Sequence, residues 1–318
     1  MMRHKVLPTL GVAATLLGVF LLYRIFEKQD FGELAEAATS VRPADLALAL
    51  MFTMASFTCI SLIEFLGVHY VRRPVPWQRI VLTAVSALGI GHAIGLAALS
   101  SGAIRYRMYG RADLGIVSTG KIVVFAALTT ASGLGTVGGV SLIWQADTLA
   151  PLLNIAPDTL RFVGMGMLVL LLAYFLVCSF SPTRIVKIWR RVRVRVPSAR
   201  FALAQFVMGS LNVLCIGGVL YATLRSFVEV HYATAAALYV SGDVSAIIAH
   251  VPGGWGVLEY IVTSVLVDER VLAGIVLYRG IYYLMPLGIG LIVFVTDELA
   301  GRRRTVRARH RERLREAI

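Results

Sequence analysis

Long apolar segments separated by short charged loops are the feature that most constrains how this chain folds. About 20 consecutive apolar residues are enough for a helix to cross a bilayer. Of the 318 residues, 58% are hydrophobic and 15% are charged, and the mean hydropathy is +0.76. No polar region is long enough to form a separate soluble domain. The sequence predicts an all-α, polytopic membrane protein, with one integral membrane domain over residues 1–300 and a basic cytoplasmic tail over residues 301–318.

Six segments are predicted to span the membrane completely. The first follows Arg3, His4 and Lys5, as a signal peptide would, but no small-residue cleavage site comes after it. We therefore expect it to remain as an uncleaved span. The six predicted spans cover residues 6–23, 44–68, 114–144, 160–180, 201–224 and 271–295.

The basic residues predict the orientation of the chain. The net charge is +13, but Lys and Arg lie in short clusters between apolar segments, most densely at residues 184–200 and 302–315. This pattern orients a membrane protein, because basic loops stay on the cytoplasmic side. It also favours contact with anionic lipid headgroups, and we expect no nucleic-acid partner. Both termini are predicted to be cytoplasmic.

Two further apolar segments, at residues 80–101 and 232–267, are predicted to be re-entrant hairpins. If the first one crossed the membrane, the basic residues Arg105, Arg107 and Arg111 would face outward. Glycines at its centre, among them Gly91 and Gly95, weaken a helix and allow a turn. An alternative with eight plain spans also keeps both termini inside, but it leaves these arginines on the outer side.

The second hairpin is predicted from a break in its middle. Proline removes a backbone donor and glycine permits conformations that other residues avoid. Broken backbone at membrane depth is tolerated only where protein buries it or where it lines a wet cavity. A tight turn with His250 and Glu259 at the interface is the alternative interpretation. The predicted break residues are Pro252, Gly253, Gly254 and Gly256.

The two hairpin centres are weakly similar. His92 and His250 are each followed three residues later by a glycine, Gly95 and Gly253. Two broken segments that enter from opposite faces are typical of inverted-repeat transporters with a binding site near the midplane. The charge pattern independently predicts these opposite directions of entry.

Ionisable residues inside the apolar segments form the candidate site, because charges at membrane depth are costly and usually functional. Arg105 is expected to bind a lipid phosphate with its planar donor fork. Glu259 is expected to attract a cationic headgroup or to pair with Arg105. The candidate substrate-binding residues are Arg105, Glu259, His250 and His92, followed by Asp243 and Arg279 in second rank.

Two charges also have simpler explanations. Glu64 lies near the predicted inner end of its span, where it is expected to pair with Arg72, Arg73 or Arg79. Arg279 lies in the last span, where snorkelling to the outer interface is the alternative to a role in binding.

Two sequence runs carry a family resemblance. The runs SGAIRYRMY at residues 101–109 and VPGGWGVLE at residues 251–259 resemble those of the membrane domain of bacterial lysylphosphatidylglycerol synthase/flippases and their stand-alone inner-membrane relatives. The resemblance implies a helical domain of the bacterial inner membrane that moves a lipid between leaflets. The synthases continue into a soluble aminoacyl-transfer domain, whereas this sequence ends at Ile318, so it does not imply synthesis.

A transporter that is not an enzyme is therefore the expected function, with an anionic or zwitterionic membrane phospholipid as its partner. The sequence has no ATP-binding motif, and Cys59, Cys178 and Cys215 lack metal-ligand spacing, so no cofactor or metal is expected. The alternatives are a membrane-embedded lipid transferase, with Glu259 or His250 as base, or a scaffold that recruits a separate lipid-synthesising enzyme.

Overall fold

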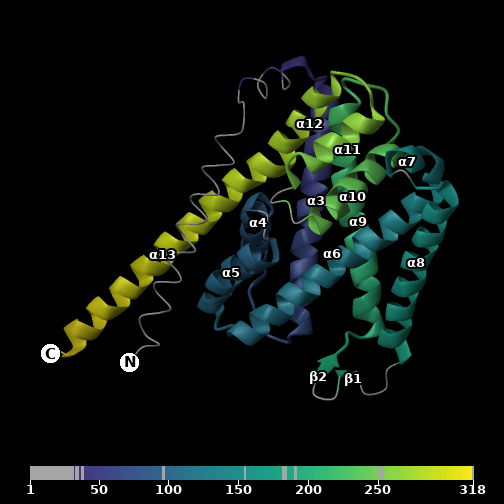
Figure 1. Cartoon of the computed structure of the whole chain (residues 1–318). Coiled ribbons are helices and arrows are strands. Elements are labelled where there is room, and N and C mark those ends of the chain that lie inside the picture. Colours follow the sequence, from purple (N-terminus) through teal and green to yellow (C-terminus); the bar gives the residue numbers. More distant parts are fainter. Residues whose placement is uncertain are drawn as a thin grey trace.

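A computed structural model describes residues 32, 36, 39–94, 97–153, 155–180, 185–189, 192–249, 251 and 254–316. This part of the chain is almost entirely helical (Figure 1). The predicted all-α class is confirmed, with the addition of a small antiparallel hairpin of β1 (Ile185–Trp189) and β2 (Val192–Arg195). The predicted span at residues 6–23 lies outside the described residues. So do His250, Pro252, Gly253 and Gly95.

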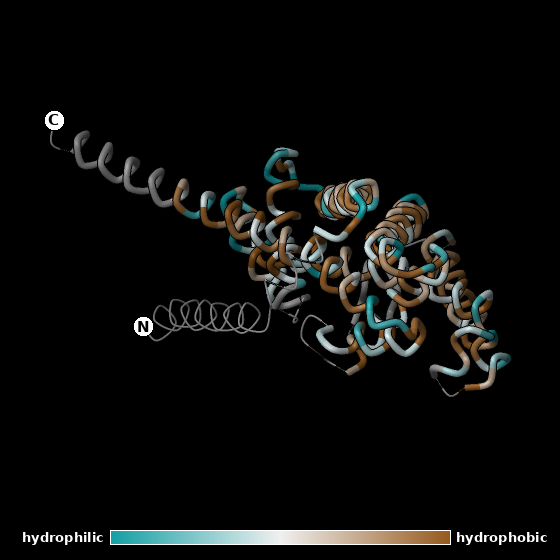
Figure 2. Tube along the Cα trace, turned by 90° about the horizontal axis from the view of Figure 1, so that it is seen from above, coloured by the Kyte–Doolittle hydropathy of each residue, from teal (hydrophilic) through white to brown (hydrophobic). Residues whose placement is uncertain are grey.

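Five helices are long and apolar enough to cross a membrane, and they match the five predicted spans within the described residues. Apolar residues predominate along these helices (Figure 2), and Phe162, Leu170 and Phe180 of α8 are largely exposed, as lipid-facing side chains would be. The five are α3 (Pro43–Tyr70), α6 (Ile116–Trp144), α8 (Pro157–Phe180), α9 (Ala199–Leu224) and a composite helix of α12 (Val271–Arg279), η3 (Gly280–Leu284) and α13 (Met285–Glu316).

The two ends of the bundle are distinct. The strands β1 and β2 lie at the same end as the exit of α13, while the short helix α7 (Ala146–Leu153) and the start of α12 lie at the opposite end (Figure 1). We name these the inner and outer ends after the predicted orientation, which itself stays a prediction. Beyond the inner end, α13 continues through residues 301–316, so the basic tail begins within a helix.

The first hairpin consists of α4 (Trp77–Ile94) and α5 (Ala97–Tyr109), followed by the short turn η1 (Gly110–Ala112). Arg79, at the start of α4, and Arg111, just after α5, form ion pairs with the same carboxylate, Asp297. The segment therefore leaves and returns at the inner end, as predicted, and the alternative with eight plain spans is wrong. The helix α5 extends through Arg105 and Arg107, beyond the predicted end of the hairpin at residue 101.

The described glycines of the first hairpin, Gly89 and Gly91, lie inside α4 and serve helix packing, so the prediction that Gly91 belongs to the break is wrong. Helix α4 continues past Gly89, where a side chain would collide with the backbone carbonyl of Pro286 in α13. At Gly91, an added Cβ would lie 3.0 Å from the Cβ of Ser101 in α5. These positions are small because two helices approach closely there, a common device in membrane bundles.

The second hairpin consists of α10 (Tyr232–Ile248) and α11 (Val257–Val265). Phe227, which precedes α10, and Leu266, which follows α11, line the same outer cavity of about 740 Å³ together with Arg42 at the start of α3. The segment therefore leaves and returns at the outer end. The two hairpins enter the bundle from opposite ends, as the charge pattern predicts.

Helices α6 and α9 cross so closely that only glycine fits at the contact. A Cβ at Gly209 would collide with the carbonyl of Thr129, and one at Gly133 would collide with the backbone of Gly209. We expect Gly209→Val to destabilise the protein by about 1–3 kcal/mol, the usual cost of overpacking. Thermal unfolding in detergent measures this effect. The matched control is Gly166→Val on α8, where nothing lies within 4 Å of the added Cβ, and equal melting temperatures for the two variants would contradict the packing argument.

Candidate functional site

Arg279, the last residue of α12, lies against the break between α10 and α11. It is 2% exposed, its Nε donates a hydrogen bond to Glu259 Oε1 (3.0 Å), and its Nη2 donates to Glu259 Oε2 (3.2 Å) and to the carbonyl oxygen of Gly254 (2.9 Å). Such a two-pronged pair is among the strongest that proteins form. Snorkelling of Arg279 to the outer interface is therefore wrong, because its guanidinium is held in the interior.

The local backbone places Glu259 for this pair. Gly254 and Gly256 have φ values of +63° and +83°, which glycine adopts without strain. Helix α11 starts directly after Gly256, whose backbone N–H donates to Glu259 Oε2 (2.8 Å). The predicted glycines Gly254 and Gly256 thus directly precede a helix whose third residue, Glu259, points at Arg279.

Aromatic rings enclose the Arg279 guanidinium. The centroid of the Trp255 ring lies 4.4 Å from its central carbon and that of the Tyr283 ring lies 4.7 Å away, so the cation contacts two π systems. The indole N–H of Trp255 is buried and has no hydrogen-bond partner among the described residues. A buried donor without an acceptor costs about 1–3 kcal/mol, so this N–H is suited to an acceptor that the described part of the chain does not supply.

Arg105 forms a second buried pair, with Glu64 of α3. Its Nε donates to both carboxylate oxygens (3.0 and 2.9 Å) and its Nη2 donates to Oε2 (2.8 Å). The Tyr109 hydroxyl donates to Glu64 Oε1 (2.9 Å). Both charged side chains are nearly inaccessible, at 5% and 1% exposure. The predicted ion-pair partners of both residues are therefore wrong. Arg105 does not pair with Glu259, and Glu64 does not pair with Arg72, Arg73 or Arg79.

His92 connects the two charged centres. It lies near the end of α4, with its ring centroid 6.4 Å from that of Tyr282 and 6.1 Å from that of Tyr283. Tyr283 in turn contacts Arg279. The first hairpin is therefore linked to Arg279 through the tyrosines of η3. The predicted direct contact between Arg105 and Glu259 near the midplane is absent among the described residues.

Asp243 is the remaining predicted residue that the structure describes. It lies on α10 and is partly exposed, and its carboxylate forms no hydrogen bond or ion pair with any described residue. Tyr239, Tyr278 and Arg279 lie within electrostatic range of it. The structure thus brings Asp243, Glu259 and Arg279 together, and places Arg105 with Glu64 in a separate centre that His92 adjoins.

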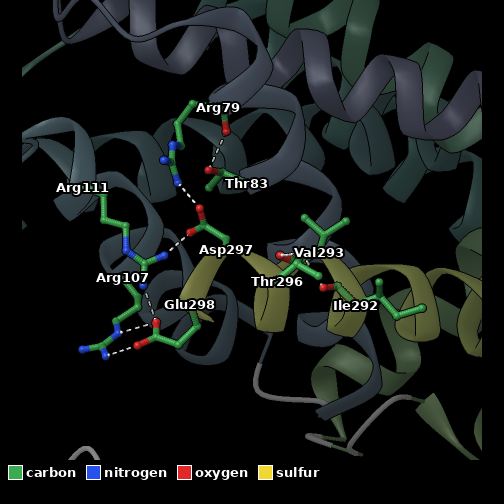
Figure 3. A network of polar contacts seen from close by, with 9 residues as sticks. All are labelled: Arg79, Thr83, Arg107, Arg111, Ile292, Val293, Thr296, Asp297 and Glu298. Carbon is green, nitrogen blue, oxygen red and sulfur yellow. Dashed lines mark hydrogen bonds and ion pairs between the residues drawn. The ribbon is translucent and has the colours of Figure 1, made fainter. Parts of the chain in front are cut away.

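Sequence reasoning missed two polar clusters. The Ser56 hydroxyl donates a hydrogen bond to Asn212 Oδ1 (2.7 Å) and is hydrogen-bonded to the Tyr282 hydroxyl (3.0 Å), which joins α3, α9 and η3 in the interior. The asparagine within an apolar span was the available signal. At the inner end, α13 is held against the first hairpin by ion pairs of two carboxylates with three arginines (Figure 3). These are Asp297 and Glu298 with Arg79, Arg107 and Arg111.

The fold and the site define a class: a polytopic helical membrane protein with two opposed hairpins and two buried arginine–carboxylate pairs. Among the proteins that are similar to this chain is one named as an inner membrane protein. The chain is 26% identical over 265 residues to the uncharacterised protein slr0712 of Synechocystis sp., with 81% of each chain covered. It is 25% identical over 288 residues to the inner membrane protein YbhN of Escherichia coli, with 88% of each chain covered. No protein-family model matches the sequence.

Proposed function

We propose that this protein moves a phospholipid, or a lipid-linked headgroup, between the two leaflets of the bacterial inner membrane. The observation that carries the proposal is the pair of opposed hairpins, each contributing to a buried arginine–carboxylate pair. Charges at membrane depth are rare and mark the routes of polar solutes. The resemblance to lysylphosphatidylglycerol flippases supports a lipid as the cargo.

The chemistry of both arginines suits a lipid phosphate. Arginine binds carboxylate and phosphate oxygens with the same planar fork. A phosphate that replaces Glu259 on Arg279 keeps the charge of the arginine compensated, and so avoids the cost of an isolated buried charge. The indole N–H of Trp255 would supply a further donor to the same phosphate. Acyl chains would stay in the surrounding bilayer, against exposed apolar side chains such as those of α8.

Lipid movement in reconstituted vesicles tests this function. We expect vesicles with the purified protein to exchange fluorescent phosphatidylglycerol between leaflets, so that a membrane-impermeant quencher removes nearly all of the fluorescence. Vesicles without protein should keep about half of it, because uncatalysed headgroup crossing carries the cost of a charge in hydrocarbon. Correctly inserted protein that leaves the lipid in place would contradict the proposal and favour the scaffold alternative.

A further inference from the structure

Asp243 is distinguished from the other interior charges by its lack of a counter-charge. Arg279 and Glu259 compensate each other, as do Arg105 and Glu64. Asp45, which is buried near the outer end, pairs with Arg42 and Arg225. Among the described residues, the Asp243 carboxylate is thus the interior charge that remains uncompensated.

Arg279 does not form an ion pair with Asp243. Arg279 acts on it electrostatically, but the Nε and Nη2 groups of Arg279 are engaged by Glu259 and by Gly254. Glu259 is itself an acid, so an ionised Asp243 would add a second negative charge beside one cation. Two nearby carboxylates that share one cation favour the neutral form of one of them.

Four tyrosines also lie within electrostatic range of Asp243. Tyr239 lies one turn before it on α10, Tyr278 belongs to α12, and Tyr282 and Tyr283 belong to η3. The rings of Tyr278 and Tyr282 are stacked, with centroids 5.9 Å apart. These rings provide low-dielectric surroundings in which an isolated carboxylate is costly. Because Asp243 is partly exposed, a small cation can still reach it.

We infer that Asp243 is a proton-binding site that couples lipid movement to a proton gradient, an inference that rests on the proposed function. An anionic lipid phosphate can bind Arg279 only when the Asp243 carboxylate does not repel it. A proton on Asp243 removes that repulsion: a hydronium ion gives its proton to a carboxylate oxygen, and an O–H bond forms. The phosphate and the proton then move together without net charge, and water accepts the proton at the other side.

The first test examines protonation without transport. Infrared spectra of the purified protein in detergent, recorded between pH 5 and 6, should contain the carbonyl band of a protonated carboxylic acid, and Asp243→Asn should lack this contribution. Asp268→Asn is the control, because the Arg270 guanidinium and backbone hydrogen-bond Asp268 and hold its pKa below the usual value, so it stays ionised. A wild-type spectrum with no such band would overturn the inference, whether or not the protein moves lipid.

The second test measures coupling. In vesicles with labelled phosphatidylglycerol, a gradient of one pH unit should drive an accumulation of label of up to about tenfold in the leaflet on the alkaline side, the limit for one proton per lipid. Asp243→Glu should keep this response and Asp243→Asn should lose it. A response to a sodium gradient at fixed pH would overturn proton binding. So would movement of phosphatidylethanolamine alone with no gradient response, since Asp243 would then bind the headgroup ammonium. If wild type moves no lipid while the infrared band is present, the proposed function fails and protonation of Asp243 stands.

Discussion

Replacing Arg105 by glutamine is expected to abolish lipid movement and to destabilise the protein by about 3–5 kcal/mol, the cost of leaving a buried charge without its partner. Glu64 is 1% exposed, and among the described residues only the Tyr109 hydroxyl would remain as its hydrogen-bond partner. The double variant Glu64→Gln/Arg105→Gln removes both charges and should recover most of the stability without recovering transport. Thermal unfolding in detergent and the vesicle assay measure the two effects separately.

The neighbouring Arg107 provides the matched control. It lies two residues further along α5 and pairs with Glu298, but it is 60% exposed. Exposed pairs contribute about 0–1 kcal/mol, so Arg107→Gln should melt close to wild type and still move lipid. Arg105→Lys keeps the charge without the planar fork, and we expect it to fold but to transport poorly. Normal transport by the double variant would show that the Arg105–Glu64 pair serves only the fold.

Replacing Arg279 by glutamine is expected to abolish lipid movement as well, with a smaller loss of stability. Glu259 is 25% exposed, so water compensates part of the charge that the variant leaves behind. We therefore expect a destabilisation of about 3 kcal/mol, the low end for a broken buried pair. Glu259→Gln leaves the more deeply buried Arg279 charged and should cost at least as much, although its amide keeps some hydrogen bonding.

Arg270 is the matched control for Arg279. It lies just before α12, pairs with Asp268 and is 71% exposed. Arg270→Gln should leave both the melting temperature and the rate of lipid movement near wild type. The combined variant Glu259→Gln/Arg279→Gln should regain stability and remain inactive. A combined variant that moves lipid at the wild-type rate would remove this pair from the proposed path.

The bundle and its hairpins could be predicted because they depend on properties local in sequence. Apolar length identifies a span, and the basic residues after position 101 require the first hairpin to return to its starting side. The break at Gly254 and Gly256 could also be predicted, because proline and glycine determine the conformation of the backbone at their own positions.

The partners of the charges could not be predicted, because pairing depends on how each helix is rotated about its axis. Two glutamates and two arginines lie within apolar segments, and the sequence does not say which faces which. Glu64 and Arg105 are 41 positions apart, on α3 and on the returning helix of a hairpin. Arg279 was only a second-rank candidate, with an interfacial position as the alternative, because nothing near it in sequence shows that Glu259, 20 positions earlier, folds back against it.

The segment η3 gives the last helix a register that an uninterrupted α-helix would not have. Over Gly280–Leu284 the backbone is π-helical, which is equivalent to one residue inserted into an α-helix. One residue corresponds to a turn of about 100° about the helix axis. If these residues returned to α-helical hydrogen bonding, Asp297 and Glu298 would swing away from Arg79 and Arg111. Because η3 begins next to Arg279, a rotation of α13 about its axis would couple ligand binding at Arg279 to the breaking of these ion pairs at the inner end.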